Sequence, residues 1–178
     1  MPLLPEDAST FHGRMQIDIR RAMPSDAEAL SAVWEVVCGE RVYTAVTRPF
    51  TPQQERDYIL SLSDREGIFV AVFDRRIVGF QSLDLWATYS DAFDHVGLMG
   101  TILLPEWRRR GIGRRLAEHT FEYARAHGYE KIVIYVRASN AGAQAFYSRL
   151  GFVRRGVLER QAKIDGEYED EVFMELFL

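Results

Sequence analysis

Arginines and two glycines are concentrated in one short segment between a predicted strand and a predicted helix. Five of the eight residues from Arg108 to Arg115 are arginine, and Gly111 and Gly113 interrupt them. The start of a helix has positive polarity and free backbone amides, so arginines in its first turn are unfavourable unless an anion binds there. Glycines let the backbone approach phosphate oxygens closely. The segment therefore predicts an anion site, and a solvated basic helix face is the plainer alternative.

Two common phosphate-binding motifs do not match this segment. A P-loop requires glycine followed by lysine and then serine or threonine. The only lysines, Lys131 and Lys163, do not follow glycine. A dinucleotide fingerprint requires a third glycine at the position of Leu116. The sequence therefore indicates a phosphate ligand of another class.

Asn140 and Tyr147 form a second pair of residues that could contribute chemistry. They lie seven residues apart in a predicted helix, so both side chains can face one ligand. Alternatively, Asn140 is only a helix cap and Tyr147 only a core aromatic. No metal site is expected, because the histidines are scattered, Cys38 is the single cysteine, and no metal-ligand spacing occurs.

Four helices are expected to position these residues. Ser25-x-x-Glu28 has the pattern of a capping box and opens the first helix. Thr51, Pro52 and Gln54 mark the start of a second helix that runs to about Ser63. The core side of the first helix is predicted to be Ala29, Leu30, Val33, Val36 and Val37. The other two helices are expected over Gly111–His127 and Asn140–Leu150, ended by Gly128 and Gly151.

Seven strands are expected from alternating or continuous apolar runs. Tight turns at Asp74-Arg75 and Asp165-Gly166 join two pairs of them. The predicted order is β-α-α-β-β-β-α-β-α-β-β, an α/β (or α+β) fold in one domain over residues 16–178, after a loose arm at residues 1–15. The strands are Gln16–Arg21, Gly67–Asp74, Arg76–Trp86, His95–Leu104, Lys131–Arg137, Phe152–Ile164 and Tyr168–Phe177.

The overall composition excludes several classes of protein. The chain has 178 residues, of which 47% are hydrophobic and 27% charged, as is usual for a single globular domain. The net charge of −4 disfavours a whole-surface nucleic-acid binder. The start lacks the layout of a signal peptide, and no apolar run reaches the ~20 residues that span a bilayer. We expect a soluble cytoplasmic protein without nucleic-acid or membrane partners.

Two motifs, taken in order, resemble a known family. Arg108-x-x-Gly111-x-Gly113 resembles the pyrophosphate-binding signature of the GNAT superfamily of N-acetyltransferases, and Ile102-Leu-Leu-Pro105 is similar to the strand end that precedes it. Asn140-Ala-Gly-Ala-Gln-Ala-Phe-Tyr147-Ser-Arg-Leu-Gly-Phe152 is similar to the second motif of that superfamily. The resemblance covers roughly residues 16–178 and implies a single N-acetyltransferase domain. It also implies a mixed, mostly antiparallel sheet of about seven strands and four helices, with two central strands splayed around the cofactor.

The resemblance implies acetyl-CoA as co-substrate and assigns residues to it. Backbone groups of the strand end pair with the pantetheine arm, and amides of the arginine–glycine loop hold the pyrophosphate. Asn140 becomes a cofactor ligand, and Tyr147 becomes both a ligand and the general acid for the departing thiolate. The implied cofactor-binding residues are Ile102, Leu103, Leu104, Arg108, Arg109, Arg110, Gly111, Ile112, Gly113, Arg114, Asn140, Ala143 and Tyr147.

The sequence does not identify the general base or the acceptor. The strand from Val96 to Leu104 holds no carboxylate, so the glutamate base that some superfamily members carry there is missing. The pattern Gly166-x-Tyr168-x-Asp170 is similar to the ends of members acting on small amines and amino acids, and nearby carboxylates would attract a cationic substrate. This favours a small-molecule primary amine as acceptor. Other candidates for the base are Glu40, Asp94, His95, Asp170 and Glu171.

Three alternative functions are considered. The chain could acetylate a protein or peptide, or it could be a catalytically idle CoA-binding protein of the same fold. A nucleic-acid-binding module that uses the arginine loop is disfavoured by the acidic net charge. Dimers are frequent among similar proteins, so a homodimer is compatible with the resemblance, although no interface is specified.

Overall fold

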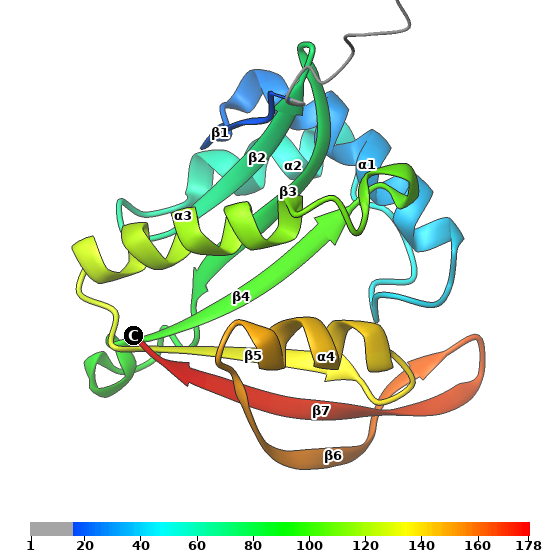
Figure 1. Ribbon diagram of the computed structural model, residues 1–178, viewed down its shortest axis with the longest axis vertical. Helices are drawn as coiled ribbons and strands as arrows, with labels where there is room; N and C mark the ends of the chain where they lie inside the picture. Colours follow the sequence, from blue (N-terminus) through cyan, green and yellow to red (C-terminus); the bar gives the residue numbers. More distant parts are fainter. Residues whose placement is uncertain (1–15) are drawn as a thin grey trace, which may run out of the picture.

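The computed structural model describes residues 16–178, and the arm predicted over residues 1–15 lies outside the described residues. Seven strands form one sheet in the order β1-β2-β3-β4-β5-β7-β6 (Figure 1). The order of helices and strands along the chain is the predicted one. The elements are β1 (Asp18–Arg21), α1 (Ala27–Gly39), α2 (Pro52–Ser61), β2 (Gly67–Phe73), β3 (Arg76–Leu85), β4 (Val96–Leu103), α3 (Ile112–Ala126), β5 (Lys131–Arg137), α4 (Ala141–Arg149), β6 (Val153–Ile164) and β7 (Glu167–Phe177).

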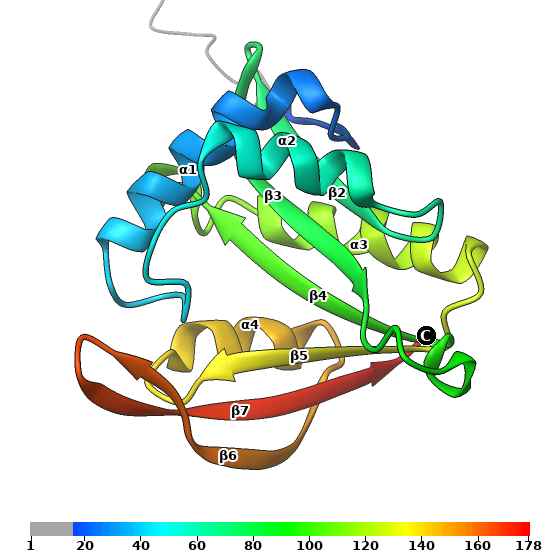
Figure 2. The same ribbon diagram turned by 180° about the vertical axis from the view of Figure 1, so that it is seen from behind.

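The helices lie on both faces of the first half of the sheet. Leu116 and Phe121 of α3 pack on one face, together with Phe69 of β2. Leu30 and Val33 of α1 pack on the opposite face with residues of β2 and β3, and α2 lies beside α1 (Figures 1 and 2). Coverage of both faces agrees with the continuously apolar sequence of β2, whereas β3 is apolar mainly from Ile77 to Phe80.

The second half of the sheet is covered on one face. Helix α4 packs on the side of β5 and β7 that carries Ile134 and Met174. On the other face, none of the helices between residues 16 and 178 lies over β5, β7 and β6, as the view from behind shows (Figure 2). Side chains on that face are therefore available to other molecules.

The two central strands separate along their length, as the resemblance implied. β4 and β5 are parallel and pair only from Val96–Lys131 to Leu98–Val133. Beyond these pairs the strands diverge (Figure 1), and the rest of β4 pairs only with β3. Between the diverging ends, backbone groups of both strands are left without a strand partner.

The second helix begins as predicted, whereas the first does not. Thr51 Oγ1 accepts from the Gln54 amide (3.2 Å), and the Gln54 side chain accepts from the Thr51 amide (2.9 Å). The capping box predicted at Ser25 is wrong. Asp26 instead accepts from the Met23 amide (2.7 Å) and pairs with Arg20 on β1, so a short 3-10 turn precedes α1.

The shifted start of α1 changes the side that faces the core. Leu30, Val33 and Val37 are buried as predicted, whereas Ala29 and Val36 are exposed. Both predicted hairpin turns are present, with positive φ at Asp74-Arg75 and Asp165-Gly166. No helix within residues 16–178 is both long and apolar enough to cross a membrane.

Candidate active site

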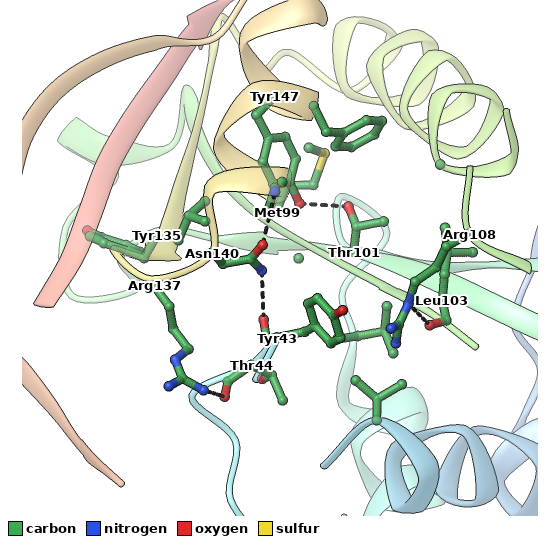
Figure 3. Close-up of a pocket in the computed structure, with 18 of the residues that line it drawn as sticks. Tyr43, Thr44, Met99, Thr101, Leu103, Arg108, Tyr135, Arg137, Asn140 and Tyr147 are labelled. Atoms are coloured by element: carbon green, nitrogen blue, oxygen red, sulfur yellow. Dashed lines mark hydrogen bonds between the residues drawn. The ribbon is translucent and has the colours of Figure 1, made fainter. Parts of the chain in front are cut away.

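A cavity of about 1110 Å³ lies where β4 and β5 separate. Its walls come from β4, the loop before α3, the end of β5, helix α4 and the segment Tyr43–Val46 (Figure 3). Ten of the thirteen predicted cofactor-binding residues line it: Ile102, Leu103, Arg108, Arg109, Gly111, Gly113, Arg114, Asn140, Ala143 and Tyr147.

Three predicted residues do not line this cavity. Leu104 and Ile112 are buried in the two hydrophobic cores. Arg110 is exposed, and its guanidinium lies 5.5 Å from the centre of the Trp107 ring. The resemblance assigns these three residues to the cofactor through their backbone groups, so the direction of their side chains does not test that assignment.

The backbone of the arginine–glycine loop has the expected form. Gly111 has φ +79°, a value that favours glycine, and it ends the approach to α3. The first helical bond of α3 runs from the Arg115 amide to Gly111 O (3.1 Å). The preceding amides of Ile112, Gly113 and Arg114 are thus the free donors of a helix start. They form a fitting cradle for a phosphate group.

Gly113 has a packing role in addition to its place in the loop. A Cβ atom at this position would lie 3.1 Å from the ring of Phe146 on α4 and 3.5 Å from Leu103. A larger residue would push α4 away from the start of α3. The glycine therefore keeps the two helix ends close together at the cavity wall.

Several arginine side chains of the loop are engaged with the protein itself, whereas anion binding at this helix start stays a prediction. Arg114 pairs with Glu118 (2.8 Å), and Arg115 donates to Ile17 O (2.7 Å). These contacts offset the unfavourable positions in the first helical turn without any anion. The argument for an anion therefore depends on the amides. Among residues 16–178, Arg109 has no recorded side-chain partner, and it lines the cavity.

Arg108 holds the segment that follows α1 beside the cavity. Its Nε donates to Leu103 O (3.0 Å), its Nη1 donates to Glu40 (2.8 Å), and its guanidinium lies 4.2 Å from the centre of the Tyr43 ring. On the other side of the gap, Asn140 Nδ2 donates to Tyr43 O (3.4 Å). The segment after α1 therefore links the α3 side to the α4 side (Figure 3).

Tyr147 is buried at the cavity wall and bonded to a residue that sequence reasoning missed. Its hydroxyl donates to Thr101 Oγ1 on β4 (2.9 Å; Figure 3). Gln81 Nε2 donates to the same oxygen (2.7 Å). Burial raises the pKa of Tyr147 to about 12, although the bond to Thr101 acts in the opposite direction. The available signal was weak: Thr101 is a polar residue within the otherwise apolar β4, but Gln81 shares β3 with Arg76, Ser82 and Asp84.

Asn140 is the helix cap, which is one of the two roles considered for it from the sequence. Its Oδ1 accepts from the Ala143 amide (3.0 Å), which makes it the N-cap of α4. It also lines the cavity, so one side chain both starts the helix and faces the gap.

The five candidates for a general base are in different surroundings. Glu40 pairs with Arg108, Asp94 lies 3.8 Å from Arg65, and Asp170 accepts from the Arg160 amide (2.7 Å). His95 is exposed outside the cavity. Only the fifth, Glu171, is a cavity-lining carboxylate within the described chain. Within residues 16–178, no group of three His, Cys, Asp or Glu side chains is placed to hold a metal ion.

Comparisons with known proteins agree with this geometry. The model of the acetyltransferase (GNAT) family matches residues 32–152. An uncharacterised N-acetyltransferase of Archaeoglobus fulgidus is 31% identical over 134 residues, 74% of this chain and 90% of the relative. A [ribosomal protein bS18]-alanine N-acetyltransferase of Salmonella typhimurium is 34% identical over 83 residues, 47% of this chain. The chain spans 56% of that relative and 43% of an uncharacterised Methanocaldococcus jannaschii N-acetyltransferase, which is 32% identical over 97 residues, 54% of this chain.

Solved structures show the same fold. A ribosomal-protein-alanine N-acetyltransferase of Brucella melitensis superposes with a TM-score of 0.84 at 23% identity, covering 90% of this chain and 99% of the other. A phosphinothricin acetyltransferase of Sinorhizobium meliloti, solved with AcCoA, gives 0.81 at 20% identity, covering 92% and 89%. The family match over most of the chain agrees with the fold and the two motifs, so this protein belongs to the acetyltransferase (GNAT) family.

Proposed function

We propose that this protein transfers the acetyl group of acetyl-CoA to a primary amine of a small molecule. Bound acetyl-CoA would supply a thioester whose carbonyl carbon the amine can attack directly. The observation that carries the proposal is the cavity between β4 and β5, with free helix-start amides at one end and Tyr147 in its wall.

The residues of the loop before α3 fit a diphosphate. The amides of Ile112, Gly113 and Arg114 are oriented as donors by the helix start, and Gly111 keeps side-chain atoms away from them. Arg109 adds a positive charge at the cavity wall. Beyond the last β4–β5 pair, the backbone of Ile102 and Leu103 has no β5 partner and could bind an extended arm as a strand would, except at Leu103 O, which accepts from Arg108 Nε.

Tyr147 is proposed as the general acid. Its Oη carries a proton that a departing sulfur requires, and Thr101 fixes the position of this oxygen at the cavity wall. Since burial raises the pKa of Tyr147 to about 12, the phenol is protonated at neutral pH and can act as a donor. Asn140 and Ala143 are proposed to contact the cofactor from the start of α4.

A second candidate function is acetylation of a protein N-terminus. One observation favours it, since the Salmonella relative is named for the alanine of a ribosomal protein. An α-amino group is easier to deprotonate than an alkylamine, because its pKa is about 7.7–8.0 rather than about 10.4. The absence of a carboxylate from β4 suits such an acceptor.

Binding and turnover test these proposals separately. Calorimetry with acetyl-CoA should show saturable binding, and thiol release should follow when primary amines are added. A peptide that begins with alanine, supplied beside the amines, tests the second candidate. Binding without thiol release from any acceptor would contradict the transferase and leave a cofactor-binding protein. Failure to bind acetyl-CoA would contradict the whole assignment.

A further inference from the structure

Glu171 is a carboxylate without a partner in the main cavity. It lies on β7, half-buried, opposite Arg137 on β5. The Arg137 guanidinium forms no hydrogen bond or ion pair with it: Nη2 donates to Glu169 (3.1 Å), Nη1 donates to Arg41 O (2.7 Å), and the buried Nε has no hydrogen-bond partner among the described residues. Within residues 16–178, no hydrogen bond or ion pair to the Glu171 carboxylate is formed. A half-buried unpaired charge is unfavourable, so a cationic ligand would stabilise it.

An apolar hollow adjoins this carboxylate on the open face of the sheet. It has a volume of about 260 Å³ and shares Tyr135 with the main cavity. Phe173 pairs with Tyr135 across β5 and β7, and their ring centres lie 5.4 Å apart. Leu158 of β6 lines the hollow and is the register partner of Glu171. Residues two apart on a strand share a face, so Glu171 and Phe173 point to the same side.

The charged residue that lines the hollow is bonded to a carboxylate outside it, which it shares with Lys131. Arg155 is its single charged lining residue, and Arg155 Nε donates to Glu175 (2.6 Å). The Tyr135 hydroxyl accepts from Trp86 Nε1 (3.1 Å), which fixes the ring at the border between hollow and cavity. On this face of the sheet, the unpaired Glu171 carboxylate therefore lies beside the apolar surface of the hollow.

We propose that the acceptor is a primary amine attached to an apolar or aromatic group. Glu171 binds the ammonium, and Tyr135, Phe173 and Leu158 contact the apolar group. This inference rests on the proposed acetyl transfer and narrows its substrate class. A di- or polyamine is disfavoured, because its second cation would lie against the apolar hollow instead of a carboxylate.

The test compares amines that differ in the group next to the amine. Thiol release is measured at saturating acetyl-CoA with phenethylamine, hexylamine, ethanolamine and putrescine. Burial of a phenyl or alkyl group should raise kcat/KM for the first two by about 10- to 100-fold over the last two. Equal rates, or faster reaction of putrescine or of an alanine peptide, would overturn the inference and leave acetyl transfer intact. No release with any acceptor would contradict the transfer itself.

Two variants assign the effect to the named residues. Phe173→Ala should remove most of the advantage of phenethylamine while the ethanolamine rate stays within about twofold, because only the apolar contact is lost. Glu171→Gln should raise the KM of every cationic amine about 10-fold and leave the KM of acetyl-CoA unchanged. Exposed residues of β7 and of the neighbouring β6 provide the controls, Phe177→Ala and Glu159→Gln, which should change neither value. Preserved amine preference in Phe173→Ala, with an unchanged melting temperature, would overturn the assignment.

Discussion

The two halves of the molecule contribute to the candidate site in different ways. In the half built from β1–β4, both sheet faces are covered, and most polar side chains beside the cavity are bonded to the protein, as in the Arg108–Glu40 pair, with Arg109 as an exception. In the half built from β5, β7 and β6, one face is open, and Glu171 has no partner in the described chain. The first half thus presents backbone amides on a rigid frame, whereas the second presents side chains.

This difference suggests that the first half mainly binds the cofactor and the second half mainly binds the acceptor. A cofactor with a constant diphosphate suits a fixed backbone cradle, which does not depend on particular side chains. An acceptor that differs between related enzymes suits side chains on an open face, which can change without loss of the core. Substitutions in the first half should therefore affect stability most, and those in the second half should affect specificity.

The largest effect is expected at Tyr147, where the two halves meet across the gap. Tyr147→Phe removes the hydroxyl that bonds Thr101 and should lower kcat by about 10²- to 10⁴-fold, because the proton donor is lost. The measurement is steady-state thiol release at saturating acetyl-CoA. Tyr129→Phe is the matched control, because Tyr129 is equally buried but lies outside the cavity. Unchanged kcat in Tyr147→Phe would remove it from the acid role.

Variants of Arg108 and Arg109 should distinguish an arginine that stabilises the fold from one that binds acetyl-CoA. Arg108→Ala should lower the free energy of unfolding by about 2 kcal/mol, because Glu40 and Leu103 O lose a partly buried cation. Arg109→Ala should leave that free energy within about 0.5 kcal/mol of the wild type and raise the KM of acetyl-CoA several-fold. Urea unfolding and acetyl-CoA titration give the two quantities. The reverse pattern would contradict the division between side chains and backbone.

Thr101 should have a smaller effect on both stability and rate. Thr101→Val leaves the Tyr147 and Gln81 donors without their shared acceptor, at a cost of about 1–2 kcal/mol in unfolding free energy. With Tyr147 less well positioned, kcat should fall about 10-fold, and Thr101→Ser should restore it. Thr120→Val is the control, because Thr120 Oγ1 is buried with no partner in the described residues. Equal loss in both valine variants would indicate a general packing effect.

Local sequence signals predicted the frame of the fold well. Turn pairs such as Asp165-Gly166 and the cap at Thr51 depend on neighbouring residues alone, so their patterns were sufficient. The start of α1 was wrong because Asp26 pairs with Arg20 on a strand, and this contact overrides the cap predicted at Ser25. A tertiary ion pair of this kind leaves no periodic trace in the sequence.

The cofactor side of the site was easier to predict than the acceptor side. The loop around Gly111 is contiguous, so its backbone role follows from a short motif. Thr101 and Tyr147 are 46 residues apart, and their contact depends on the divergence of β4 and β5. Glu171 could not be chosen among five candidates, because its lack of a partner depends on Arg137 bonding to the distant segment after α1. A choice among such candidates requires the three-dimensional structure.

The smallest expected effect is on the pH dependence of the free energy of unfolding. It differs in sign between two carboxylates of β7, Glu171 and Glu175. Burial and the neighbouring Glu169 raise the pKa of Glu171, whereas Lys131 and Arg155 lower the pKa of Glu175. The other groups around Glu171 are Arg137, which pairs with Glu169 through Nη2 and leaves its buried Nε without a partner in the described chain, and Tyr135 on β5, with Leu158 opposite on β6. A raised native pKa means that protonation stabilises the fold. This contribution is present below the ordinary glutamate pKa and is lost as pH rises through the raised value.

Glu171→Gln should therefore be slightly more stable than the wild type at pH 7.5, by less than about 1 kcal/mol, and the difference should vanish near pH 4. Glu175→Gln should show the opposite sign. Its lowered pKa stabilises the fold above the ordinary glutamate pKa, and the contribution is lost as pH falls through the lowered value. Urea unfolding of both variants across this pH range gives the comparison. A loss of stability in Glu171→Gln at pH 7.5 would show that this carboxylate stabilises the fold, which would contradict its role as an unpaired ligand-binding charge.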